Sequence, residues 1–328
     1  MGDRLVRAWR PAALLILVAG LSALPLQASD SRLFTFTQMF MAITIASSWN
    51  LTGGFTGYVD FGHVVFFGVG AYGTGIVMNK LDWPFVPALL VGAAAAAVFA
   101  AFVGSATLRL KGPYFSIAML GTYGAMREIV RVWKPLTGGG SGLSLPIVHN
   151  RPVFYYVTLT FLAAFLAGIW WLRRTQFGSS LVAIREDEIG AEMRGINTTV
   201  AKSSIFVVAG FVTGVVGGLW AYQNTFLSPS IVFEEETTVD AVMMSMLGGL
   251  GTVAGPVIGG VIIFWLRDVV WSNFLDYHLI VQGSVLILIV LYFPEGIIGR
   301  LSRRSGAVSI SHLLRRRTTD AAPAGEKP

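Results

Sequence analysis

The stretch PFVPALLVGAAAAAVFAAFVGSAT, Pro84–Thr107, contains no charged side chain. A helix needs about 20 consecutive apolar residues to cross the hydrocarbon core of a bilayer, and this stretch is long enough to do so. Arg109 and Lys111 follow it directly. Because Lys and Arg are concentrated in cytoplasmic loops, these two residues place the end of the stretch on the cytoplasmic side of a membrane.

The composition of the whole chain agrees with this interpretation. Of its 328 residues, 54% are hydrophobic and 13% are charged, whereas soluble domains average about 25% charged residues. The chain also has 38 glycines, which are frequent in membrane helices because they let helix backbones approach closely. We therefore predict an all-α, polytopic integral membrane protein with about eight to ten membrane helices. The other candidate spans are Pro11–Ala28, Leu33–Leu51, Phe61–Asn79, Pro113–Trp133, Pro152–Leu172, Ser203–Thr225 and His278–Phe293.

Both ends of the chain require separate interpretation. The segment Pro11–Ala28 follows three arginines, and LQAS, Leu26–Ser29, overlaps its end, a pattern also typical of a secretory signal peptide. We expect an uncleaved first helix, with cleavage as the alternative. Residues 302–328 are polar and rich in Arg, Ala and Pro, which predicts a flexible cytoplasmic tail. Residues 1–301 are then one transmembrane domain.

The region Val239–Trp265 differs from the other spans because glycine and proline interrupt it. The motif MLGGLGTVAGP divides it into pieces of about 10 residues, each too short to span a bilayer. The distribution of Lys and Arg places the N-terminus, the loop 173–202 and the C-terminus in the cytoplasm, which requires an odd number of crossings after Asp240. The final helix supplies one crossing. We therefore predict a broken or re-entrant hairpin anchored at its ends by Asp240 and by Arg267 beside Asp268, with one long tilted helix as the alternative.

The densest group of charges lies in SLVAIREDEIGAEMRGIN, Ser180–Asn197, within the predicted cytoplasmic loop 173–202. Ser179 or Ser180 could cap a helix there, and Gly195 could end it. The spacing of the apolar residues predicts one amphipathic helix. Its apolar face would carry Val182, Ile189, Met193 and Ile196.

The charges of this segment favour a protein partner over lipid. Arg185, Glu188 and Glu192 are spaced as helical neighbours and can support the helix. Helices that lie on lipid usually carry Lys and Arg on their polar face, whereas this segment is acidic at its centre. We expect partner docking, with a helix resting on lipid as the alternative. The candidate docking residues are Val182, Arg185, Glu186, Glu188, Ile189, Glu192, Met193 and Gly195.

A second glycine-rich stretch, Gly53–Gly75, lies in the first half of the chain. Paired glycine-interrupted segments in two halves indicate a substrate path between them. Asp60 and His63 lie at the mouth of a span, where ionisable groups are functional candidates because they are costly at membrane depth; an interfacial pair that caps a helix is the alternative. The candidate path residues are Asp60, His63, Gly68, Gly248, Gly249 and Gly251.

The sequence shows no catalytic or metal-binding motif. It lacks GxxxxGK[ST], HExxH and GxSxG, and it has no cysteine and only four scattered histidines. We expect no catalytic residues, no metal and no cofactor, so any ATP hydrolysis would occur in a partner. The basic residues flank apolar segments, which predicts membrane lipid as a neighbour and no nucleic acid.

Five motifs resemble, in this order, the permeases of branched-chain amino acid ABC importers. They are GYVDFGHVVFFGVGAY, LRLKGPYFSIAMLGTYGAMREIVR, LTGGGSGL, SLVAIREDEIGAEMRGIN and LGGLGTVAGPVIGG. The resemblance covers about Ala42–Gly299. It implies ATP-driven import of branched-chain amino acids at the bacterial inner membrane, with a sister permease, two ATPase subunits and a periplasmic solute-binding protein. It also implies that the helix around Glu188–Gly195 docks in a cleft of the ATPase.

Two departures from the family leave the substrate open. The family commonly has Ser where this chain has Asp60, and often an acidic residue where it has Ser141. Similar permeases serve urea and short amides, which is one alternative. A stand-alone channel or ion-coupled transporter is another, but it would require a relay of buried charges that the sequence does not show. A membrane enzyme is disfavoured by the missing catalytic motifs.

Overall fold

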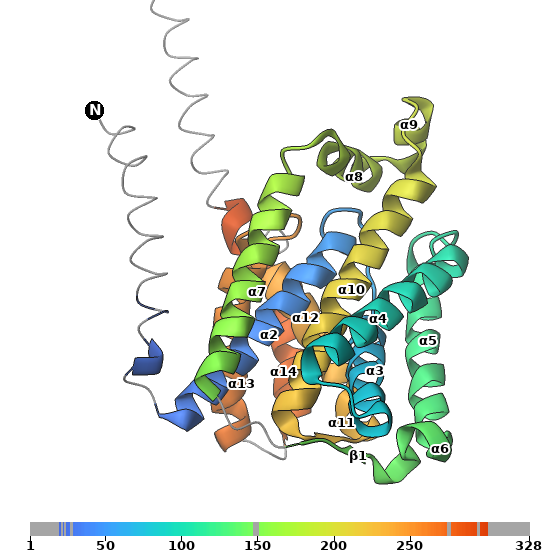
Figure 1. Ribbon diagram of the computed structural model, residues 1–328. Helices are drawn as coiled ribbons and strands as arrows, with labels where there is room; N and C mark the ends of the chain where they lie inside the picture. The colour runs from blue at the N-terminus through green and yellow to red at the C-terminus, as the bar shows by residue number, and fades with distance from the viewer. Residues whose placement is uncertain are drawn as a thin grey trace, which may run out of the picture.

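The computed structural model describes residues 20, 22, 24–26, 29–146, 151–273, 277–293 and 296–300, and this part of the chain is almost entirely helical (Figure 1). The all-α prediction is confirmed. The longer helices are α2 (Asp30–Thr52), α3 (Val64–Leu81), α4 (Phe85–Thr107), α5 (Pro113–Val132), α7 (Arg151–Leu172), α10 (Thr198–Asn224), α13 (Gly255–Asn273) and α14 (His278–Tyr292). The shorter ones are α6 (Lys134–Thr137), α8 (Gln176–Glu186), α9 (Glu188–Met193), α11 (Pro229–Val232) and α12 (Glu235–Gly248), with 3-10 turns at Leu24–Leu26 and Gly139–Ser141.

Four of these helices, α3, α4, α7 and α10, are long and apolar enough to cross a membrane, counted over the described residues. The predicted spans coincide with α2, α3, α4, α5, α7, α10 and α14 to within a few residues at each end. The predicted first span, Pro11–Ala28, lies mostly outside the described residues, and the predicted tail, 302–328, lies wholly outside them. The assignment of residues 1–301 to one domain stays a prediction.

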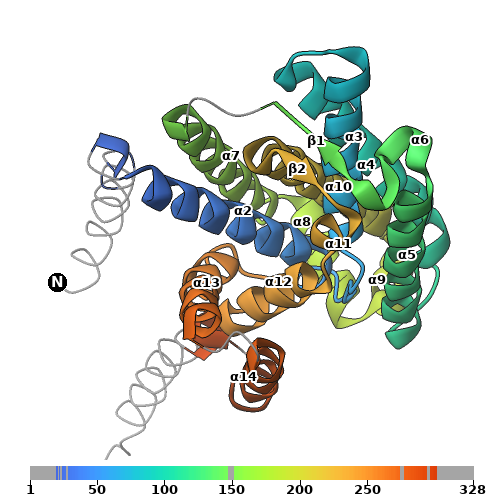
Figure 2. The same ribbon diagram turned by 90° about the horizontal axis from the view of Figure 1, so that it is seen from below.

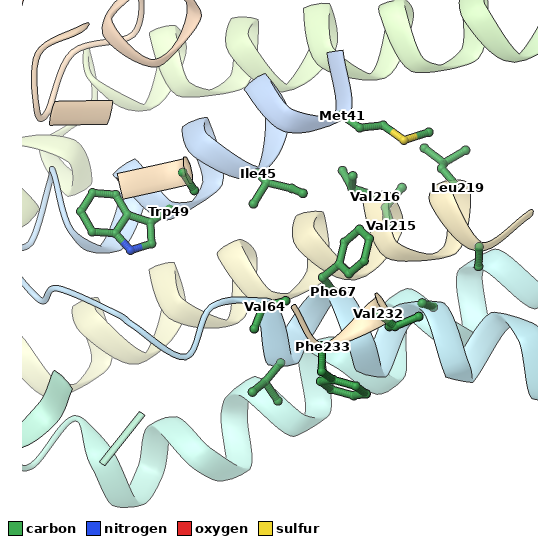
Figure 3. Packing of buried hydrophobic residues seen from close by; sticks show 14 of the residues in the cluster. Met41, Ile45, Trp49, Val64, Phe67, Val215, Val216, Leu219, Val232 and Phe233 are labelled. Atoms are coloured by element: carbon green, nitrogen blue, oxygen red, sulfur yellow. The ribbon is translucent and has the colours of Figure 1, made fainter. Parts of the chain in front are cut away.

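Glycines bring the backbones of α3, α4 and α10 into contact. A Cβ atom on Gly70 would lie 2.1 Å from the carbonyl oxygen of Gly214, and one on Gly92 would lie 2.6 Å from that of Gly70. Only glycine permits such approaches, because any side chain would separate the helices. Helix α2 packs on the same group. Figure 3 shows Met41 and Ile45 of α2 near Phe67 of α3 and Val215, Val216 and Leu219 of α10, and Trp49 of α2 belongs to the same apolar cluster.

The predicted interruption in Val239–Trp265 is confirmed, and the alternative of one long helix is wrong. Helix α12 ends at Gly248, and α13 begins at Gly255. Between them Gly249 and Gly251 have φ angles of 129° and 69°, which side-chain-bearing residues rarely adopt. A Cβ on Gly259 would lie 1.8 Å from the carbonyl oxygen of Met244. The two helices therefore form a tight antiparallel hairpin, seen side by side in Figure 2.

One arm of the hairpin, helix α12, is too short to cross a bilayer. Helix α12 has 14 residues, which extend about 21 Å at a rise of 1.5 Å per residue, against a hydrocarbon core about 30 Å thick. The guanidinium of Arg267 on α13 forms ion pairs with Asp240 and Glu236 on α12. The predicted anchoring by Asp240 and Arg267 is thus confirmed, and the re-entrant placement of the hairpin in the membrane stays a prediction.

Candidate functional site

Helices α8 and α9 lie together at one end of the helix bundle (Figure 1). The opposite end carries α11 and a two-stranded antiparallel sheet of β1 (Leu143–Ser144) and β2 (Phe226–Leu227). Because α10 runs from α9 to β2, the charged segment and the stretch Glu234–Glu236 are at opposite ends of the molecule. The positive-inside prediction requires this separation, although the side of the membrane that each end faces stays a prediction.

The charged segment forms two helices, so the prediction of one helix is wrong. Asp187 is extended, with φ −157° and ψ 104°, and separates α8 from α9. The cap of α8 is Thr175 rather than Ser179 or Ser180, and its hydroxyl accepts a hydrogen bond from the Gly178 amide at 3.1 Å. An extended aspartate before a helix is a common start position. Gly195, with φ 83°, follows the end of α9 as predicted.

Glu188, the first residue of α9, is held by two buried partners. Its carboxylate accepts hydrogen bonds from Lys202 Nζ on α10 at 2.6 Å and from the Tyr58 hydroxyl at 2.7 Å. Lys202 Nζ also donates to the Tyr58 oxygen at 2.8 Å and to the Leu108 carbonyl at 3.2 Å. We call these three side chains the Tyr58–Glu188–Lys202 cluster. It connects α9 to α10 and to the loop between α2 and α3.

The electrostatics of the cluster favour the charged carboxylate. Burial by itself would raise the pKa of Glu188, but the hydrogen bonds from Lys202 and Tyr58 outweigh it and lower that pKa. Burial, followed by the bond to Glu188, raises the pKa of the Tyr58 hydroxyl well above its usual range. Lys202 is only 5% exposed, and a buried ammonium of this kind requires a paired acid. The cluster is therefore an ion pair with a neutral tyrosine donor.

Arg185 of α8 reaches the break in the α12–α13 hairpin. Its Nη1 atom donates to the carbonyl oxygen of Gly54 at 2.8 Å, and a Cβ on Gly251 would lie 2.8 Å from that same nitrogen. Asn50, at the end of α2, accepts a hydrogen bond from the Gly251 amide and donates to the Thr252 carbonyl, both at 2.9 Å. Arg185 therefore joins α8 to both glycine-rich stretches.

The remaining side chains of α8 and α9 divide into an inner and an outer set. Leu181, Ile184 and Ala191 are buried in an apolar cluster with Leu51, Phe55 and Ile169. In contrast, Val182, Ile189 and Met193 are 42%, 60% and 81% exposed, and the side chain of Glu186 is 72% exposed. We call Val182, Glu186, Ile189 and Met193 the outer surface.

The apolar spacing identified part of this arrangement. The predicted common face of Val182, Ile189, Met193 and Ile196 is wrong, because Ile196 packs against the inner cluster while the other three are exposed. The bend at Asp187 rotates α9 relative to α8. The periodicity of a single continuous helix therefore does not predict which side chains share a face. Among the predicted docking residues, Arg185, Glu188 and Glu192 make inward hydrogen bonds; that of Glu192 is to the Thr198 hydroxyl at 2.6 Å.

Asp60 and His63 are fully buried, at 0% exposure each. Asp60 Oδ2 lies 3.0 Å from His63 Nδ1, and Asp60 Oδ1 accepts a hydrogen bond from the Gly62 amide at 2.8 Å. His63 Nε2 lies 2.9 Å from the Thr213 hydroxyl on α10, which donates to Ser48 on α2 at 3.0 Å. The pair thus links α2, α3 and α10. A role for it in a translocation path stays a prediction.

The glycines predicted to line the path lie in close contact with a ring or with backbone, or form a turn. A Cβ on Gly68 would lie 2.2 Å from the ring of Phe233, and one on Gly248 would lie 1.7 Å from the Gly255 carbonyl oxygen. Gly249 and Gly251 form the turn of the hairpin. The structure therefore gives each glycine a packing or turn role, and their place in a path stays a prediction. The sequence interpretation missed Tyr58 and Lys202, although a lysine just inside a membrane helix could have indicated a buried acidic partner.

One family matches most of the chain. Its sequence model, described as the branched-chain amino acid transport system permease component, matches residues 31–290. The chain belongs to this family. The permease is 25% identical over 308 residues to the high-affinity branched-chain amino acid transport system permease protein LivM of Salmonella typhimurium, covering 84% of this chain and 72% of that protein. It is 27% identical over 311 residues to the corresponding LivH of Escherichia coli K12, covering 83% of this chain and 98% of LivH.

A third relative shows that the similarity extends beyond amino acid systems. The L-arabinose ABC transporter permease protein AraH of Azospirillum brasilense is 29% identical over 165 residues, covering 47% of the permease and 45% of AraH. No solved structure matches the chain. Four membrane-length apolar helices lie in the described part of the permease. It is a multi-pass membrane component of ABC transport and is not itself an enzyme.

Proposed function

We propose that the permease forms part of an ATP-driven importer for branched-chain and related hydrophobic amino acids in a bacterial inner membrane, with both termini in the cytoplasm. Its partners would be a sister permease, two ATPase subunits and a periplasmic solute-binding protein. The family match over residues 31–290 supports the amino acid substrate, as do the two relatives whose names specify branched-chain amino acid transport.

The observation that carries coupling to an ATPase is the arrangement of α8 and α9. Three large apolar side chains of the outer surface are exposed at a position where other residues fix the backbone beneath them. Ile189 and Met193 are four residues apart on α9 and are exposed together, and exposed apolar side chains in groups mark interaction sites. The Tyr58–Glu188–Lys202 cluster and Arg185 would transmit a displacement of this surface to α10 and to the α12–α13 hairpin.

The alternatives receive less support. Asp60 is the departure that would favour a polar solute such as urea, but its carboxylate is fully buried and bonded to His63 and Gly62. A stand-alone channel or ion-coupled transporter would give the outer surface no partner.

Co-purification tests the docking surface. The full chain is expressed with the sister permease, the ATPase subunits and the binding protein, and ATPase retention is measured after Ile189→Asp together with Met193→Asp. We expect loss of both retention and amino acid import, since two carboxylates would enter an apolar interface. The matched control is Leu81→Asp, at an exposed leucine that ends α3 far from α8. Full retention and full import in the double variant would refute docking at this surface.

A further inference from the structure

A cavity of about 360 Å³ lies between α2, α3, α10, α12 and α13. It is separate from the outer surface, because it borders the start of α12 and Ile231 of α11, at the end of the bundle away from α8 and α9. Small-molecule sites in proteins typically enclose about 300–1,000 Å³. The cavity is therefore large enough for one small solute.

The cavity walls are apolar over most of their extent. Met41 and Ile45 of α2, Phe67 of α3, and Met244 of α12 line it, with Phe264 of α13. Figure 3 shows Met41 and Ile45 on the same side of α2, near Phe67. Methionine side chains adapt to ligands of differing shape because they are unbranched and flexible. Such walls suit an aliphatic side chain and offer little to a solute that needs hydrogen bonds on every face.

One end of the cavity is charged. Asp240, which is 6% exposed, lines it together with Glu234 and Arg267. Asp240 forms an ion pair with Arg267 and also accepts a hydrogen bond from Gln282 at 2.9 Å. Arg267 forms a second ion pair, with 3.3 Å between its Nη2 atom and Glu236 Oε2. Charged groups at this depth are costly and are usually retained for function. Both signs of charge thus lie at the same end of an apolar cavity.

We propose that this cavity is a binding station for the transported solute, an α-amino acid with an aliphatic side chain. The proposal rests on the importer function proposed above. The ammonium group of the solute lies against Asp240 and Glu234, and its carboxylate lies toward Arg267. Its aliphatic side chain occupies the space between Met41, Ile45 and Met244. A carboxylate can accept about four hydrogen bonds, so Asp240 can serve the solute as well as its present partners.

The test uses the complete importer in membrane vesicles, with its sister permease, ATPase subunits and binding protein, and measures uptake of labelled leucine and labelled valine. Ala42→Phe extends a ring into the cavity from α2, where Ala42 is a lining residue. We expect uptake of leucine to fall at least about tenfold, since displacing one or two methylenes in such a pocket has effects of this size. The matched control is Ala94→Phe on the exposed face of α4, which should leave uptake unchanged.

A smaller change measures selectivity. Ala42→Val removes part of the space, so uptake of leucine should fall more than uptake of valine, and the leucine-to-valine ratio should decrease by about threefold or more. A purely structural defect would reduce both solutes equally. If Ala42→Phe does not assemble with the ATPase subunits, the leucine-to-valine uptake ratio of Ala42→Val still tests whether the cavity binds the solute.

The outcomes separate the two proposals. If the wild-type complex accumulates neither amino acid, the importer function is refuted, and the cavity proposal falls with it. If the wild type imports both but Ala42→Phe assembles and imports leucine at the wild-type rate, the cavity proposal alone is overturned. An unchanged leucine-to-valine ratio in Ala42→Val also overturns it.

Discussion

Replacing Glu188 by glutamine should weaken the attachment of α9 to the rest of the permease. The substitution keeps the size of the side chain but removes its charge. It leaves the Lys202 ammonium, which is 5% exposed, with neutral acceptors alone, among them the Tyr58 hydroxyl and the Leu108 carbonyl. This loss destabilises the closed state, in which α9 packs against α10. It does not affect an open state in which α9 has detached, because Lys202 is solvated there.

The magnitude follows from the burial of the ion pair. Breaking a buried pair by removing one partner costs about 3–5 kcal/mol. The Glu188 side chain is 16% exposed, so some solvent screens the pair and we take the lower limit, about 3 kcal/mol. Each 1.36 kcal/mol corresponds to a factor of ten in an equilibrium constant. The open population of α9 should therefore rise by about 100-fold.

A thiol probe can measure this opening because the chain has no cysteine. Ala191 of α9 is 2% exposed, so the single variant Ala191→Cys should react slowly with a maleimide. Adding Glu188→Gln should raise the labelling rate of this cysteine by about 100-fold when opening of α9 is fast relative to labelling. The matched control is Glu186→Gln, which removes a carboxylate from a neighbouring side chain that is 72% exposed. Equal labelling rates in the Glu188→Gln and Glu186→Gln backgrounds would refute the role assigned to the cluster.

Three further predictions concern acid stability, the hairpin and the Asp60–His63 pair. The pKa of Glu188 in the folded protein is lowered from 4.5, so the stabilisation of the fold by its carboxylate should be complete above about pH 4.5 and decrease as the pH falls below that value. The difference in melting temperature between wild type and Glu188→Gln should therefore narrow only below about pH 4.5. Gly259→Ala places a methyl group 1.8 Å from a carbonyl oxygen and should cost at least about 1–3 kcal/mol in denaturant unfolding; Gly283→Ala in α14, with nothing within 4 Å, should cost nothing, and equal stability of the two variants would contradict the tight hairpin. Asp60→Asn should destabilise the permease by about 1–3 kcal/mol, since it disrupts a fully buried pair, and wild-type thermal stability in that variant would argue against a structural role for the pair.

The two glycine-rich stretches meet at one end of the molecule. Asn50 and Gly54, at the end of α2, both contact the turn around Gly251, and Arg185 touches both stretches. A force applied to α8 would therefore reach the hairpin through direct contacts. Helix α12 extends from that turn toward Asp240 and the cavity, so the proposed docking surface and the proposed solute site are connected by a single short helix.

The amino-acid sequence by itself determined the membrane helices and the break in the hairpin. An apolar run such as Pro84–Thr107 can satisfy its backbone in lipid only as a helix, so its limits follow from composition. The motif MLGGLGTVAGP likewise predicts a break, because its glycines and proline divide Val239–Trp265 into pieces of about 10 residues, each too short to span a bilayer. These are local properties, and periodicity and residue type suffice to describe them.

The tertiary structure alone decided which charges of Ser180–Asn197 face inward. Glu188 bonds to Tyr58, which is 130 residues distant in the sequence, and Arg185 bonds to Gly54, which is 131 residues distant. A helical period assigns Glu188 to the polar outer face, because solvation is the favourable state of an isolated carboxylate. A buried lysine supplied by another helix reverses that preference, and only the packing of α10 against α9 brings that lysine within reach.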